Sequence, residues 1–107
     1  MNSEKVRKLN DTFRTTLIGG KIILTPGVAE LQVESVKELL KLIPKYQDFN
    51  EDNDPYGEHD FGSFEFHSKK FFFKIDYYDK SYKYGSEDPS DPEVTGRVMT
   101  IMLAEEY

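Results

Sequence analysis

The sequence predicts an α+β domain, in which a small antiparallel sheet of about four strands has two helices packed on one face. Three observations predict this class. Two segments in the N-terminal half repeat apolar residues at helical spacing, residues 64–78 alternate in the manner of a hairpin, and the C-terminal segment is rich in strand-forming residues. The chain of 107 residues suffices for one hydrophobic core and is too short for two. We therefore expect a single domain over residues 1–107.

The first helix is expected over residues 3–17. Ser3 is the expected N-cap, and Gly19-Gly20 is expected to end the helix, because glycine readily adopts the left-handed conformation found at helix C-termini. The apolar residues fall at steps of three and four, which places them on one side of the helix: Val6, Leu9, Phe13 and Leu17.

A short strand and a second helix are expected next. Residues 21–25 are apolar and β-branched, and Pro26-Gly27 closes them with a turn. Ser35 and Glu38 have the spacing of a capping box near the start of the second helix, and Pro44 marks its end. The apolar residues at helical spacing are Val33, Val36, Leu39, Leu40 and Ile43.

A hairpin and a last strand are expected to complete the sheet. The turn falls near Ser68-Lys69, and one face of the hairpin, with Phe71, Phe73, Ile75 and Tyr77, is expected in the core. Residues 94–105 fit either a strand or a helix. We expect a strand, because Gly96 weakens a helix and the segment is apolar on both faces. The strand at residues 21–25 is expected at an edge of the sheet.

Composition and charge exclude several classes of function. The chain has no cysteine, which excludes a disulfide scaffold, a thiolate nucleophile and cysteine-ligated zinc. The first residues lack an apolar run, so we expect neither a signal peptide nor a membrane anchor, and we expect a cytoplasmic location without a membrane partner. The net charge is −6, which disfavours binding to a phosphate backbone. The densest group of basic residues is interrupted by Asp76 and Asp79, so we expect no direct nucleic-acid binding; its members are Lys69, Lys70, Lys74, Lys80 and Lys83.

The most distinctive run is residues 53–62, which reads Asn-Asp-Pro-Tyr-Gly-Glu-His-Asp-Phe-Gly. Together with residues 9–11, 24–28, 74–79, 85–92 and 100–104, this run resembles a small bacterial family catalogued as a domain of unknown function. The resemblance covers nearly the whole chain. The resemblance implies occurrence in proteobacterial genomes and on plasmids or other mobile elements. Members of such families have no assigned activity, so the resemblance does not indicate one for this chain.

Glu58-His59-Asp60 is the strongest candidate for catalysis. A histidine that titrates near neutrality beside carboxylates can act as a general base. Neighbouring side chains of an extended segment point to opposite sides, so the orienting acid for His59 would come from elsewhere, such as Asp76 or Asp79. A histidine that braces the loop is the alternative interpretation. The enzyme hypothesis is a small hydrolase or metal-assisted enzyme centred on His59, Glu58, Asp54 and Asp76.

Asp52, Asp54 and Gly57 partly match a calcium-binding loop. If Asp52 takes the first position, Tyr56 takes the fifth and Ser63 the twelfth, where an oxygen ligand and a bidentate glutamate are required. A solvated acidic loop is the better interpretation. We therefore expect no metal and no cofactor, with a calcium or magnesium site at Asp52 and Asp54 as the weaker alternative.

The leading hypothesis is a non-enzymatic interaction protein. One side of a three- or four-stranded sheet cannot bury all of Phe71, Phe72, Phe73, Tyr77, Tyr78, Tyr82 and Tyr84, and exposed aromatic residues beside carboxylates suit contact with a basic protein surface. Ordinary strand tyrosines with their hydroxyls in water are the alternative interpretation. An inhibitor of a host nucleic-acid-directed defence complex is the more specific form of this hypothesis, and a structural subunit of a larger assembly is a further alternative. The oligomeric state stays open. The expected binding residues are Asp48, Asp52, Asp54, Tyr56, Glu58, Asp60, Tyr77, Tyr78 and Tyr82.

Overall fold

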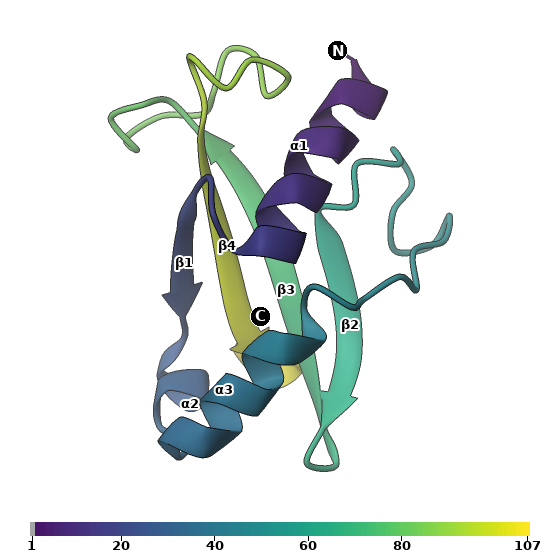
Figure 1. The fold of residues 1–107 in the computed structure, drawn as a ribbon, viewed down its shortest axis with the longest axis vertical. Helices are drawn as coiled ribbons and strands as arrows, with labels where there is room; N and C mark the ends of the chain where they lie inside the picture. The colour runs from purple at the N-terminus through teal and green to yellow at the C-terminus, as the bar shows by residue number, and fades with distance from the viewer. Residues whose placement is uncertain (1) are drawn as a thin grey trace.

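Four strands form one sheet in the order β1-β4-β3-β2 in the computed structural model, which describes residues 2–107 (Figure 1). The strands are β1 (Lys21–Leu24), β2 (Phe61–Phe66), β3 (Lys69–Tyr78) and β4 (Gly96–Leu103). The helices are α1 (Ser3–Thr16), α2 (Pro26–Ala29) and α3 (Val33–Leu42), and a 3-10 turn, η1 (Ala104–Glu106), follows β4. The structure thus confirms the α+β class and the strand at the C-terminal end.

The direction of β1 differs from the expected antiparallel sheet. β1 lies at the edge, as predicted, but it pairs with β4 in parallel, with Lys21 opposite Val98 and Leu24 opposite Ile101. The other two pairings are antiparallel, so the sheet is mixed. No short turn joins β1 to β4, and residue patterns alone therefore do not specify their relative direction.

The core lies between the sheet and the helices on one of its faces. Figure 1 shows α1 and α3 on the same side of the sheet. The inward residues of β3 and β4 meet Phe13 of α1, Val28 of α2, and Leu39 of α3. Each fully buried side chain of this size contributes about 1.5–3 kcal/mol through the hydrophobic effect. The buried strand residues are Phe71, Phe73, Ile75, Met99 and Ile101.

The ends of α1 differ from the predicted ones. Asn2 is the N-cap, and its side chain accepts a hydrogen bond from the Lys5 amide at 3.1 Å, whereas Ser3 is already helical. Leu17 adopts the left-handed conformation at φ 59°, and its amide donates to the Phe13 carbonyl at 2.7 Å. Gly20 serves packing instead, because a Cβ there would lie 2.6 Å from the carbonyl oxygen of Arg97.

The segment around Pro26 is a short helix rather than a turn. Pro26 stands at the first position of α2, where proline is favoured. The next helix, α3, begins at Val33 after Gln32, so Ser35 and Glu38 lie within it and form no capping box. Within residues 2–107, no helix combines the length and the apolar character needed to span a membrane.

Candidate functional site

The acidic loop, residues 47–60, leads from α3 to β2 and projects beyond α1 and β2 (Figure 1). Its first turn is held by its own asparagines. The Asn50 Oδ1 atom accepts from the amides of Asp52 at 2.9 Å and of Asn53 at 3.1 Å, and Asn53 Oδ1 accepts from the Asn50 amide at 3.0 Å. Asparagine favours such local bonds to the backbone, which give a loop a defined shape.

Asp54 organises the second half of the acidic loop. Its side chain is buried, and its Oδ1 atom accepts from the amides of Glu58 at 3.0 Å and of His59 at 3.1 Å. These bonds give an acceptor to backbone amides that would otherwise have none in the protein interior. The Asp54 carboxylate therefore faces amides of its own loop.

His59 ties the acidic loop to α1. Its ring stacks on Phe49 with the centroids 3.9 Å apart, and its Nδ1 atom donates to Asp11 Oδ1 at 2.8 Å. The His59 Nε2 atom lies 3.7 Å from Asp54 Oδ2. Asp11 also pairs with Arg14, whose Nη2 atom lies 3.1 Å from Asp11 Oδ1. The histidine thus occupies the bracing position that the sequence left as the alternative to a catalytic one.

Arg14 anchors the start of the same loop. Its side chain is buried, and its Nη1 atom donates to the carbonyls of Ile43 at 3.0 Å and of Tyr46 at 2.7 Å. Its guanidinium carbon lies 5.2 Å from the centre of the Phe49 ring. Both ends of the acidic loop are therefore fastened to α1, through Arg14 and His59.

A buried polar network lies beneath α1. Asn10 donates from Nδ2 to Tyr77 Oη at 2.8 Å and to the Glu58 carbonyl at 3.0 Å, and its Oδ1 atom accepts from Arg97 Nε at 2.8 Å. Tyr77 in turn donates to Glu58 Oε1 at 2.8 Å. Burial raises the pKa of Tyr77 far above its ordinary value, so this hydroxyl stays protonated and serves as a fixed hydrogen-bonding group.

Asp60 closes the acidic loop beside this network. Burial, together with the nearby charge of Glu58, raises the pKa of the Asp60 carboxyl to about 6. Burial also lowers the pKa of the Arg97 guanidinium, whose ordinary value is so high that the group remains charged.

The expected binding residues divide into three groups. Asp48, Asp52 and Tyr56 are exposed on the acidic loop, and Tyr56 retains 77% of its accessible surface. Asp54, Glu58, Asp60 and Tyr77 lie buried or partly buried around the network, where their polar atoms serve the fold. Tyr78 and Tyr82 lie at the face of the sheet that the helices leave uncovered, in a hollow that they line together with Lys21, Asp76 and Thr100.

Asp76 does not join the other residues of the enzyme hypothesis, among which Asp54 lies 3.7 Å from His59. Asp76 pairs with Lys74, with 3.0 Å between Lys74 Nζ and Asp76 Oδ2, on the uncovered face of the sheet. The carboxylates nearest to His59 are those of Asp11 and Asp54 instead. Within the part of the chain that the structure describes, no three histidine, aspartate or glutamate side chains are arranged to hold a metal ion.

The residues of this region that sequence reasoning missed include Asn10, Asp11 and Arg97. A signal for Asn10 exists, because it lies one helical turn after Val6 and one before Phe13, on the apolar side of α1. A polar residue in such a row indicates a buried hydrogen-bonded group. Asp11 and Arg97 have no comparable signal, since their partners come from distant segments.

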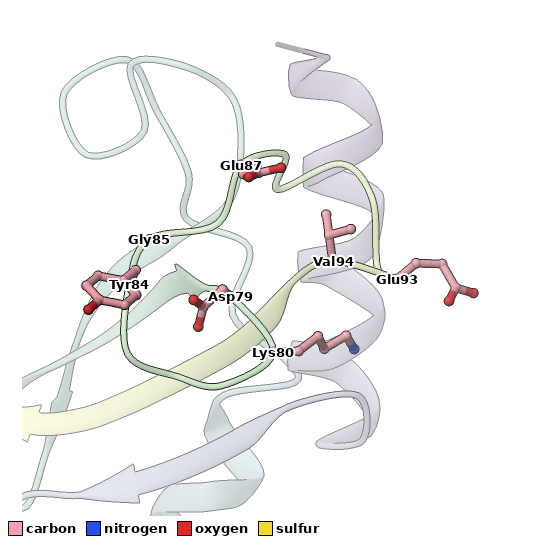
Figure 2. A pocket seen from close by; sticks show the side chains of 7 residues that line it. All are labelled: Asp79, Lys80, Tyr84, Gly85, Glu87, Glu93 and Val94. Atoms are coloured by element: carbon pink, nitrogen blue, oxygen red, sulfur yellow. The ribbon is translucent and has the colours of Figure 1, made fainter.

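A wide hollow of about 490 Å³ lies outside these groups, in the segment that joins β3 to β4 (Figure 2). Asp79 in its wall accepts from Ser81 Oγ at 2.7 Å and from the Lys83 amide at 3.2 Å, and the Ser81 bond in particular lowers the pKa of the Asp79 carboxyl. This carboxylate shapes the turn. The hollow is lined by Asp79, Lys80, Tyr84, Gly85, Glu87, Glu93 and Val94.

Comparison with known proteins gave one family match. The family model described as "Protein of unknown function (DUF3768)" matches residues 24–106, which include the acidic loop, β2, β3 and β4, but only the last residue of β1. Neither the curated proteins nor the solved structures gave a match to the chain.

Proposed function

We infer the function from the site itself, because the chain belongs to the family described as protein of unknown function (DUF3768), and that description names no activity. We propose that the protein is a non-enzymatic interaction protein. Its contact surface is the loop tip, which we define as Asp48, Glu51, Asp52 and Tyr56, and its partner is a protein with a basic surface.

The observation that carries this proposal is the use of His59 as a brace. The ring stacks on Phe49 and bonds to Asp11, so the one histidine beside the carboxylates of the acidic loop is engaged in holding that loop on α1. A loop that is already ordered loses little conformational entropy on binding, which favours affinity. Bracing of this kind supports a binding surface better than a reactive centre.

The chemistry of the loop tip supports a basic partner. Residues 47–60 contain no lysine or arginine, so no cation of the loop itself neutralises Asp48, Glu51 and Asp52. Tyr56 offers a large exposed aromatic surface of the kind enriched in protein contacts. Carboxylates also suit sites built for phosphates, and we propose a nucleic-acid-directed defence complex of a bacterial host as the partner class.

The test compares two variants that change the net charge equally. One carries Asp48→Lys, Glu51→Lys and Asp52→Lys at the loop tip, and the matched control carries Glu30→Lys, Glu34→Lys and Glu38→Lys, which are exposed residues on or near α3. Each protein is immobilised and exposed to a lysate of the native host, and the captured proteins are identified by mass spectrometry. Asp54 and Glu58 are left intact, because they are buried.

We expect the wild type and the control to retain the same basic protein and the tip variant to lose it. Retention should also fall as NaCl is raised, because exposed charge pairs are screened by salt. Equal capture by all three proteins, or equal loss from both variants, would show that the loop tip is not the contact surface.

A further inference from the structure

Arg97 is a buried cation without a counter-ion. Its side chain lies beneath α1 with 4% of the residue's surface exposed, and it forms no ion pair with any residue in the range 2–107. Buried arginine is rare unless a carboxylate or another anion neutralises it. Arg14, the other buried arginine of this region, follows that rule through Asp11.

The hydrogen bonds of Arg97 leave one nitrogen free. Its Nε atom donates to Asn10 Oδ1 at 2.8 Å, and its Nη2 atom donates to the Pro89 carbonyl. Nη1 has no acceptor among the described residues and is not fully enclosed, since Arg14 Nε is the one enclosed side-chain nitrogen there that lacks a partner. Glu58 is close enough for its charge to favour the guanidinium, but its carboxylate accepts from Tyr77 and not from Arg97.

Arg97 lines a cavity of about 250 Å³ between α1, the turn that follows it, and the segment that leads into β4. Lys80 lines the same cavity, and Figure 2 shows its side chain extending from the loop towards α1. Thr12 adds a hydroxyl that makes no hydrogen bond within the described chain. The lining contains two cationic side chains and no carboxylate, in a chain whose net charge is −6, and its members are Leu9, Thr12, Phe13, Ile18, Gly19, Lys80, Pro92, Thr95 and Arg97.

We propose that this cavity binds a small monocarboxylate that carries an apolar body. The carboxylate takes the place of the missing counter-ion of Arg97, accepts hydrogen bonds from Nη1 and from Lys80 Nζ, and thereby makes the strong charge-assisted bonds that guanidinium and ammonium groups form with anions. The apolar body packs on Leu9, Phe13 and Ile18. The site shares no residue with the loop tip and does not depend on the function proposed for it.

Benzoate is a suitable probe, because it combines one carboxylate with an apolar ring of a size that the cavity can hold. The isotope-labelled full chain is titrated with sodium benzoate at constant ionic strength, and the backbone amide resonances are followed by NMR. Benzyl alcohol serves as the uncharged analogue and inorganic phosphate as the anion without an apolar body. We expect saturable shifts with benzoate at Thr12, Ile18, Gly19 and Lys80, and none with either of the other two compounds.

Two variants separate the cavity from general attraction of anions. Lys80→Met removes one charge and keeps the aliphatic stem, and we expect it to weaken benzoate binding by about tenfold or more, as for the loss of one charge-assisted hydrogen bond. Lys83→Met is the matched control, since Lys83 is exposed on the same segment and does not line the cavity, and we expect it to bind like the wild type. Both residues are exposed, so both variants should fold.

The proposal is overturned by shifts that do not saturate, by shifts centred on another surface, or by equal affinity in the Lys80→Met and Lys83→Met variants. Binding of phosphate as tight as that of benzoate would overturn the assignment to a carboxylate with an apolar body. Arg97→Met should abolish binding, and if that variant does not fold, the Lys80 pair decides the question.

Discussion

Asn10 helps to fix the position of α1 against the acidic loop and the sheet. It is fully buried, and its amide group reaches three other segments through Glu58, Tyr77 and Arg97. A buried polar group with all its hydrogen bonds made specifies one arrangement, because any other arrangement leaves a donor or acceptor unpaired. The network therefore fixes where α1 sits on the sheet.

Asp60 is the residue with the clearest effect of pH. Its pKa is raised from the ordinary 3.8 to about 6, so between these values the folded protein binds this proton more fully than the unfolded chain does. Stability contributed by the protonated group is present below about pH 4 and is lost as the pH rises through about 6. At neutral pH the Asp60 carboxylate thus opposes folding.

We predict that Asp60→Asn stabilises the protein at pH 7 and not at pH 4. The expected gain in the free energy of unfolding is about 1 kcal/mol, which allows for the solvent screening of a partly exposed group. Urea unfolding of both proteins at the two pH values measures it. A gain of equal size at pH 4 would contradict the electrostatic explanation, because the wild-type group is then largely protonated.

At the scale of the elements, the β2–β3 hairpin carries strain at its turn. Phe66 pairs with Lys69 across two turn residues, His67 at φ 50° and Ser68 at φ 64°. Two positive φ angles define the turn type that best matches the twist of a hairpin, and glycine is favoured at its second position. The alternation of residues 71–77 specifies the strand, whereas His67 and Ser68 are not the residues that this type of turn favours.

We predict that Ser68→Gly stabilises the protein by about 0.5–1 kcal/mol, because glycine adopts a positive φ without a steric penalty. His67 is left unchanged, because its ring stacks on the ring of Phe66 with the two centroids 3.9 Å apart. Thermal unfolding measures the effect. Ser68→Val serves as the control and should destabilise the protein, because a β-branched residue is strained at positive φ. If both variants change the melting temperature in the same direction, backbone strain is not the cause.

At the scale of the whole molecule, β4 is the element on which the sheet depends. It lies between β1 and β3, and six of its eight residues, Gly96 to Met99 with Ile101 and Met102, are buried. Its pairing with β1 joins residues near the two ends of the chain, Lys21–Leu24 and Val98–Ile101. The sheet is therefore complete only when the C-terminal strand is in place.

We predict that Ile101→Ala lowers the free energy of unfolding by about 2–5 kcal/mol, the usual cost of a cavity in a tightly packed core. Ile23→Ala makes the same chemical change at the edge strand, where Ile23 is 49% exposed, and should cost less than about 1 kcal/mol. Urea unfolding followed by tyrosine fluorescence measures both. Similar losses in the two variants would contradict the central role of β4.

The acidic loop shows most clearly where a sequence pattern stops being informative. Its composition indicates a polar loop, and the structure confirms a loop, but composition does not distinguish Asp52, which faces solvent, from Asp54, which accepts from two loop amides. The difference comes from the position of the loop against α1, which depends on contacts across more than 25 residues of sequence, from His59 to Asp11 and from Arg14 of α1 to the Ile43 carbonyl. Of the expected binding residues, the ones that stay exposed could be identified only after this position was known.

The sequence by itself determined the features that depend on neighbouring residues. Helical spacing determined that α1 is a helix and which side of it is apolar, alternation determined the hairpin and its inward face, and apolar character on both faces favoured a strand for β4. The tertiary structure alone decided the parallel direction of β1, the network around Asn10 and the burial of Arg97. Those features depend on hydrogen bonds and packing between segments far apart in the chain, and local periodicity carries no information about such contacts.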